Sequence, residues 1–122
     1  MSRGIPVLRV GDALLVTVQI DLKDTLADAF QEDLLDALAG STATGLVIDI
    51  SGLDFVDSYV ARILAETGKM AHLMGAVTVL VGMRPTVAAT LVRMGFRMEG
   101  VETALNVDHG LALITQLRHT KR

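Results

Sequence analysis

The order of apolar and polar residues along the chain predicts short strands that are followed by amphipathic helices. Strand-like apolar runs occupy residues 7–10, 14–18, 45–50, 76–81 and 101–104. Only Gly11, Asp12 and Ala13 separate the first two runs, so these two predict a hairpin. The runs at 45–50 and 76–81 are apolar almost throughout, which is typical of strands that are buried on both faces.

Between these runs, apolar residues recur at intervals of three and four, which is the helical period. Helices are expected at about 26–39, 58–75 and 85–95, and from Asn106 onwards. Asp24 or Thr25 is expected to cap the first helix, and Asn106 the last. Pro85 opens the third helix at a position where a missing N–H has no cost.

The helix expected from Ser58 has a clear apolar face. This face carries Val60, Ile63, Leu64, Thr67, Ala71 and Met74. Arg62, Glu66 and Lys69 fall on the opposite face, which is the expected solvent side. A serine therefore sits at a helix N-terminus, just beyond the carboxyl end of a strand, where sites tend to collect in open α/β sheets.

A hairpin that is followed by strand–helix units predicts an α/β fold with a mostly parallel sheet and right-handed crossovers. The chain has 122 residues, which suits one domain that buries a core without disulfides. We expect this single domain to span residues 1–122, with an ordered core at about 7–117 and a basic tail at 118–122.

Composition narrows the function classes. Hydrophobic residues make up 51% of the sequence, although its aromatic residues are only 3 phenylalanines and 1 tyrosine. The core is therefore expected to be aliphatic, and the mean hydropathy of +0.48 predicts apolar surface that another subunit covers. The net charge of −3, without a basic face, gives nucleic-acid binding little support. Since no apolar run has the length of a membrane span and the N-terminus lacks a signal-peptide pattern, a cytoplasmic protein is expected.

Ser58 is the first candidate for a functional residue. The first turn of a helix has N–H groups without intrahelical partners, and the helix dipole adds partial positive charge, so a phosphate on Ser58 would meet favourable donors. Asp57 opposes this, because a second negative charge lies one residue away. The alternative is that Asp57 or Ser58 is simply the N-cap, and spacing alone favours this capping role.

Four ordered segments resemble a known family. They are VDSYVAR at 56–62, AETG at 65–68, VGMRP at 81–85 and LVRMGF at 91–96. Together they are similar to the STAS domain of bacterial anti-sigma factor antagonists, most closely the RsbS-type subunit of the stressosome. The resemblance extends from about Val7 to Leu117. It implies a fold in which helices cover the sheet and the first strand runs antiparallel, with Ser58 as a phosphorylation site that also caps its helix.

The resemblance also implies partners. A protein of this kind would hold a serine kinase of the RsbT type and release it once Ser58 is phosphorylated. It would assemble with RsbR-type STAS subunits and with further copies of itself, and a phosphatase would reverse the modification. The alternative is a free-standing anti-anti-sigma antagonist that binds an anti-sigma kinase without forming a large assembly.

Thr86 is a second candidate for phosphorylation. It follows Pro85 in the first turn of a predicted helix, so unpaired N–H groups would again favour an anion. Some relatives within the resembled family use a second hydroxyl residue, which supports this assignment. The alternative is a first-turn threonine that helps to cap the helix.

We expect the kinase to contact the first turns of the helices that open at Ser58 and Pro85, together with the loop at 51–56. These segments follow adjacent predicted strands, so they should share one edge of the sheet. The expected contact residues are Asp54, Phe55, Val56, Asp57, Tyr59, Arg62 and Arg84.

Enzymatic alternatives have less support in the sequence. Ser58 as a nucleophile would need a base that a third group positions, and it does not lie in a Gly-x-Ser-x-Gly elbow. The histidines are assigned to three separate elements without metal-ligand spacing: His72, His109 and His119. The aspartates at 49, 54 and 57 form an acidic rim that could suggest a Mg²⁺ site, but loop and capping roles explain them better. We therefore expect no enzymatic activity, no metal and no cofactor.

Overall fold

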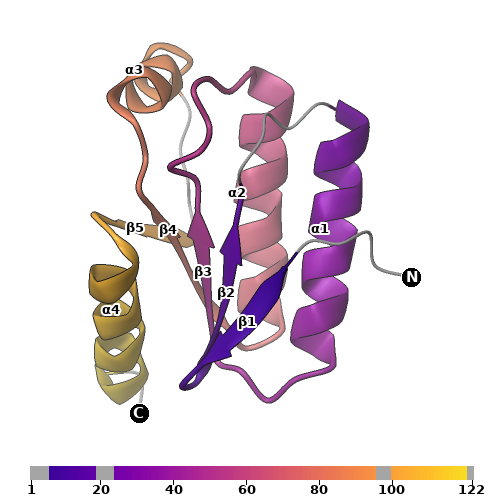
Figure 1. Cartoon of the computed structure of the whole chain (residues 1–122), viewed down its shortest axis with the longest axis vertical. Coiled ribbons are helices and arrows are strands. Elements are labelled where there is room, and N and C mark those ends of the chain that lie inside the picture. The colour runs from indigo at the N-terminus through magenta and orange to yellow at the C-terminus, as the bar shows by residue number, and fades with distance from the viewer. Residues whose placement is uncertain (1–5, 19–23, 96–99, 121–122) are drawn as a thin grey trace.

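The computed structural model describes residues 6–18, 24–95 and 100–120. Its elements follow in the order β1 (Val7–Val10), β2 (Ala13–Thr17), α1 (Asp24–Ala39), β3 (Gly45–Asp49), α2 (Ser58–Leu73), β4 (Val77–Val81), α3 (Pro85–Arg93), β5 (Val101–Ala104) and α4 (Val107–Thr120). The strands form one sheet in sequential order from β1 to β5 (Figure 1). β1 pairs antiparallel with β2 and all other pairs are parallel, so the predicted fold class is confirmed.

Several boundaries differ from the prediction. Val10 pairs with Ala13, so the hairpin turn has two central residues, Gly11 and Asp12, instead of three. Gly11 has a φ of +58°, which suits the two-residue turns that match the twist of paired strands. Helix α1 already begins at Asp24, so Asp24 belongs to the helix and the residue before it lies outside the described part of the chain. Phe96, from the fourth segment of the resemblance, also lies outside the described residues.

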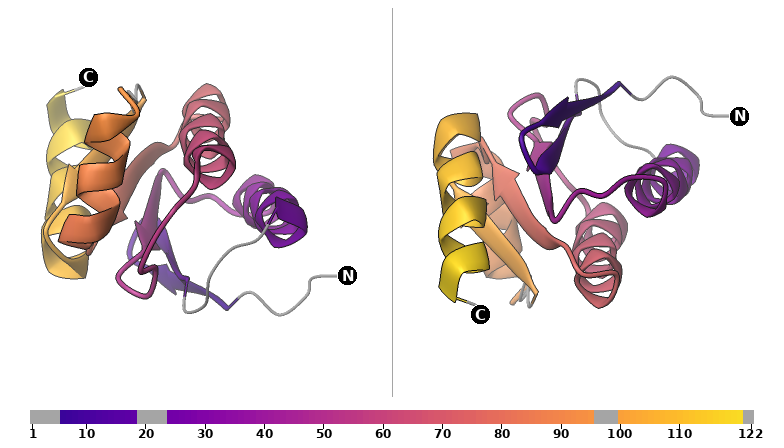
Figure 2. Two further views of the ribbon diagram at one scale, coloured as in Figure 1. Left: turned by 90° about the horizontal axis from the view of Figure 1, so that it is seen from above. Right: turned by 90° about the horizontal axis from the view of Figure 1, so that it is seen from below.

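Helices cover the two faces of the sheet unequally. Figure 2 shows α1 and α2 on one side of the strands and α4 on the other. Alternate residues of β3 point to opposite faces: Leu46 and Ile48 join the larger core with α1 and α2. Val47 joins the smaller core beneath α4, where it meets Ile114. Helix α3 lies beyond the carboxyl end of the sheet (Figure 1).

Glycines allow the helices to approach the sheet closely. A Cβ atom on Gly110 of α4 would lie 2.8 Å from Cγ1 of Val81, closer than real side chains pack. A Cβ atom on Gly68 of α2 would collide with Cγ2 of Val101 on β5. Both helices therefore depend on a missing side chain at the contact point.

Candidate functional site

The segments that follow β3 and β4 lie at the same edge of the sheet. Residues 45–49 of β3 pair in parallel with residues 77–81 of β4, so their carboxyl ends coincide. The loop at 50–57 leads from β3 into α2, and residues 82–84 lead from β4 into α3 (Figure 1). As predicted, Ser58 and Thr86 thus stand at the starts of two helices on one edge.

Asp57, not Ser58, caps helix α2. The backbone of Asp57 is extended, with φ −95° and ψ 178°, and its Oδ1 accepts a hydrogen bond from the N–H of Val60 at 2.9 Å. Its carboxylate also complements the positive end of the helix dipole. Ser58 is the exposed first helical residue, and no described residue is hydrogen-bonded to its hydroxyl. The predicted capping role of Ser58 is therefore wrong, because the preceding side chain already satisfies the N–H.

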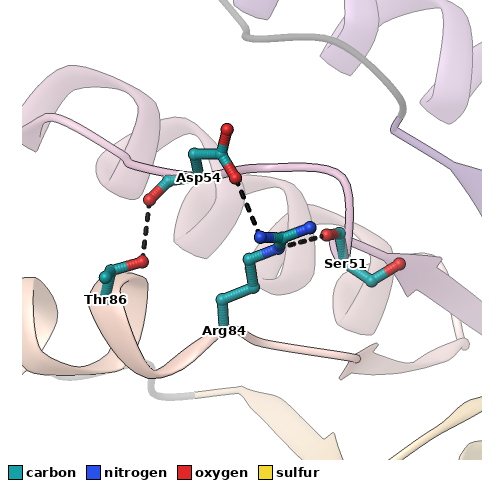
Figure 3. Close-up of polar contacts among 4 residues, drawn as sticks. All are labelled: Ser51, Asp54, Arg84 and Thr86. Atoms are coloured by element: carbon teal, nitrogen blue, oxygen red, sulfur yellow. Dashed lines mark hydrogen bonds and ion pairs between the residues drawn. The ribbon is translucent and has the colours of Figure 1, made fainter.

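A polar cluster joins the β3–α2 loop to the start of α3 (Figure 3). Nε of Arg84 donates to the carbonyl oxygen of Ser51 at 2.8 Å, and Nη1 lies 3.0 Å from Oδ1 of Asp54. The hydroxyl of Thr86 donates to the carbonyl oxygen of Asp54 at 2.8 Å. Thr86 therefore does not cap α3, because its hydroxyl is turned towards the neighbouring loop as a donor.

The loop before α2 carries both exposed and buried side chains. Phe55 is 63% exposed, whereas Leu53 and Val56 are 1% and 3% exposed and pack in the larger core. Val56 does not fit the predicted contact surface, because its apolar side chain is an anchor of the loop. Tyr59 is partly buried and donates its hydroxyl to Oδ1 of Asp28 at 2.6 Å, which ties α2 to α1. Arg62 is exposed one turn further along α2.

The three aspartates of the predicted acidic rim, at 49, 54 and 57, each make a separate local contact. Asp49 accepts a hydrogen bond from the N–H of Ser51 at 2.9 Å, while Asp54 pairs with Arg84 and Asp57 caps α2. Within residues 6–18, 24–95 and 100–120, no group of three or more histidine, aspartate or glutamate residues is arranged to hold a metal ion.

The histidines differ from their predicted placement in one respect. The backbone N–H of His109 is capped by Oδ1 of Asn106 at 2.9 Å, as expected for the first turn of α4. This helix continues to Thr120 and so includes His119 as well. The three histidines therefore lie on two elements, with His72 in the last turn of α2.

An open cavity of about 450 Å³ lies where β3 and β4 end beside the N-terminus of α4. Sequence reasoning did not find it, because its walls come from three loops that are far apart along the chain. Its lining residues are Asp49, Ser51, Val81, Gly82, Leu105, Asn106, Val107 and Asp108. The two carboxylates in this lining disfavour a phosphate-bearing ligand.

Comparison with known protein families identifies the family of this chain. The model of the STAS domain matches residues 5–109. The chain belongs to the STAS domain family. In the part of this STAS protein that the structure describes, no helix is both long and apolar enough to cross a membrane.

Three relatives place the protein within the family. RsbS of Moorella thermoacetica, solved as the variant S58E, is 40% identical with a TM-score of 0.81, over 94% of this chain and 97% of that chain. A chain from a structure of the stressosome, described there as a signal integration and transduction hub, is 41% identical with a TM-score of 0.75, over 93% of this chain and 98% of that chain. The RsbT co-antagonist protein RsbRA of Bacillus subtilis (strain 168) is 27% identical over 117 residues, which are 95% of this chain and 43% of that protein. The chain thus spans less than half the length of this curated relative, and the predicted resemblance to the RsbS type is confirmed.

Proposed function

We propose that this chain is a non-enzymatic signalling subunit that holds a serine kinase of the RsbT type and releases it when Ser58 is phosphorylated. The observation that carries this proposal is the division of roles at the start of α2. Asp57 caps the helix, which leaves the exposed hydroxyl of Ser58 without a described partner. A kinase can therefore modify Ser58 without first breaking a bond that holds the fold.

The neighbours of Ser58 supply the mechanism of release. A phosphoserine carries nearly two negative charges at neutral pH. The carboxylates of Asp54 and Asp57 lie in the same loop, and Phe55 exposes its ring there. A partner surface that fits this ring and a neutral hydroxyl would face repulsion and the desolvation of a phosphate after modification. In the solved RsbS variant, glutamate replaces a serine and adds negative charge to that protein. Ser58→Glu in this chain would likewise test the effect of negative charge on kinase binding.

Assembly with other STAS subunits is the second part of the proposal. The 41% identity to a chain from a stressosome structure supports an oligomeric state, and the similarity to RsbRA supports subunits of the RsbR type as partners. Strand β1 lies at one edge of the sheet and exposes Leu8 by 61% and Val10 by 36%. Exposed apolar side chains on an edge strand favour association with another subunit.

The test is phosphorylation of the purified chain by an RsbT-type kinase with Mg-ATP, followed by mass spectrometry. We expect one phosphate on Ser58 of the unmodified chain. In Ser58→Ala, the tryptic peptide that contains position 58 should carry no phosphate. Kinase binding should weaken after modification, and treatment with a serine phosphatase should restore it. Equal labelling of Ser58→Ala would show that the site is wrong.

Light scattering with RsbR-type subunits separates the proposed assembly from the alternative. A large complex is expected when the two kinds of subunit are mixed. If the chain binds the kinase yet forms no large complex, the alternative of a free-standing anti-sigma factor antagonist is favoured.

A further inference from the structure

The loop between β3 and α2 is anchored on its inner side by two apolar side chains. Leu53 and Val56 are buried in the larger core, and the N–H of Leu53 donates to the carbonyl oxygen of Ile50 at 3.0 Å. These contacts fix the depth of the loop on the sheet edge. They leave open how the outward pair, Asp54 and Phe55, is directed.

Arg84 contacts this outward part of the loop at two points. Its guanidinium donates to the carbonyl oxygen of Ser51 and pairs with the carboxylate of Asp54, three residues further on. The planar fork of arginine can reach both acceptors at once, whereas the single ammonium group of lysine cannot reproduce this geometry. Arg84 itself stands directly before Pro85 at the rigid start of α3, which is a fixed support for the contact.

Thr86 adds a third contact from the first turn of α3. Its hydroxyl donates to the carbonyl oxygen of Asp54 at 2.8 Å, so α3 holds both the backbone and the side chain of this one residue (Figure 3). Phe55 follows Asp54 directly, and its direction depends on the peptide group that accepts this bond. The exposed aromatic ring is thus oriented by Arg84 and Thr86, which lie 29 and 31 positions further along the sequence.

We propose that Arg84 and Thr86 are positioning residues, which hold Asp54 and Phe55 in the orientation that the kinase binds. This inference rests on the proposed function and adds a role for α3, which sets the affinity for the kinase through the loop. It also assigns Thr86 a chemical role that differs from that of Ser58. A phosphate on Thr86 replaces its hydroxyl hydrogen, so the donor to Asp54 is lost, and the new charge competes with Asp54 for Arg84.

The two carbonyl contacts should matter more than the ion pair. The side chains of Arg84 and Asp54 are 53% and 76% exposed, and water screens an ion pair at such a surface. Asp54→Asn should therefore change the loop less than Arg84→Ala or Thr86→Val, both of which remove a donor to a backbone carbonyl. This order of effects would not be expected if charge alone governed the loop.

The first experiment measures backbone order in the free protein by ¹⁵N relaxation. In the unmodified chain, residues 54–56 should have order parameters of about 0.85, and in Arg84→Ala and Thr86→Val these should fall below about 0.6. Arg84→Lys should restore little of the order. Arg93→Ala removes the same charge from the other end of α3 and should leave the loop unchanged. Unaltered order at 54–56 in Arg84→Ala would overturn the proposal.

The second experiment measures the kinetics of Ser58 phosphorylation by an RsbT-type kinase with the same variants. KM should rise roughly three- to tenfold in Arg84→Ala and Thr86→Val, while kcat stays within about twofold, because docking and not phosphoryl transfer is affected. A loosened loop with an unchanged KM would also overturn the proposal, since the contacts would then be merely structural. If the unmodified chain is not phosphorylated on Ser58 at all, the proposed function fails, and the relaxation data alone then decide whether α3 orders the loop.

Discussion

At the scale of single residues, Asp57 and Ser58 are neighbours with separate tasks. The carboxylate of Asp57 closes the first turn of α2, while Ser58 presents its hydroxyl to solvent. A phosphate on Ser58 would also stand at the positive end of the helix dipole, which offsets part of its repulsion by Asp57. Modification at this position is therefore compatible with an intact helix.

This division predicts unequal effects on stability. Asp57→Ala should lower the free energy of unfolding by about 1 kcal/mol, because the N–H of Val60 loses its cap. Ser58→Ala should change it by less than about 0.5 kcal/mol, as is usual for an exposed residue without such a contact. Urea denaturation followed by circular dichroism measures both values. A loss in Ser58→Ala as large as that in Asp57→Ala would refute the assignment of the cap.

Phe55 is the residue most suited to anchor the kinase. It is a large aromatic side chain that is 63% exposed in the loop before α2, and buried aromatic anchors dominate many protein interfaces. Phe55→Ala should weaken kinase binding by about 1–2 kcal/mol, or roughly five- to thirtyfold in Kd, as measured by titration calorimetry. The matched control is Leu73→Ala, which removes a large side chain that is 86% exposed at the opposite end of α2. A similar loss in both variants would mean that the kinase does not dock at the predicted edge.

At the scale of elements, helix α2 depends on its contact with the far edge of the sheet. Gly68 faces Val101 of β5 so closely that an added methyl group would collide with it. Alanine is favoured over glycine within a helix by about 1 kcal/mol, whereas overpacking a core costs about 1–3 kcal/mol. In Gly68→Ala, the cost of the collision with Val101 should therefore exceed the gain in helix propensity.

We predict that Gly68→Ala lowers the free energy of unfolding by about 1–2 kcal/mol. Val101→Ala removes the atoms that the new methyl group would meet, so the double variant should be more stable than the sum of the single effects indicates. Thermal or chemical denaturation of the four proteins measures this coupling. Strict additivity would show that the helix and β5 do not meet at this point.

Most elements could be predicted because their periodicity is strong. The nearly continuous apolar run of β3 and the three- and four-residue spacing of α2 place their buried residues correctly, apart from Met74, which is 45% exposed. The choice between Asp57 and Ser58 as the cap could not be made, since both residue types cap helices and they are adjacent. The contact of Thr86 with Asp54 joins residues 32 positions apart, and a backbone carbonyl as acceptor leaves no mark in the sequence. The burial of Val56 was missed for a related reason, because loop residues lack a period.

At the scale of the whole molecule, the helices cover the two faces of the sheet unequally, and this favours association with another subunit at β1. Leu8 pairs with Leu15, and Val10 with Ala13, so these β1 side chains lie on the same face as the core beneath α4. Among the described residues, helix α4 packs chiefly on β3, β4 and β5, towards the edge of the sheet opposite β1. An apolar strip at the edge therefore remains for another subunit.

We predict that the chain self-associates through this strip. Sedimentation velocity at high micromolar concentration should show dimers or larger species, and Leu8→Lys should shift the population towards the monomer. Leu73→Lys introduces the same charge at a more exposed apolar position on α2 and should leave the distribution unchanged. A monomeric unmodified chain under these conditions would contradict the prediction.

The sequential order of the strands has a consequence for synthesis on the ribosome. Each new strand finds its only earlier neighbour already made, so the sheet can grow from β1 in the direction of translation without inserting a strand between two others. The face of the sheet that α4 covers stays exposed for longer. Its core residues are buried only after Ile114 of α4 has been synthesised; they are Val47, Val79 and Val81. At typical elongation rates this interval lasts for roughly seconds, long enough for nascent chains to aggregate or recruit chaperones. Helix α4 thereby determines when the second face of the sheet in a newly made copy becomes covered.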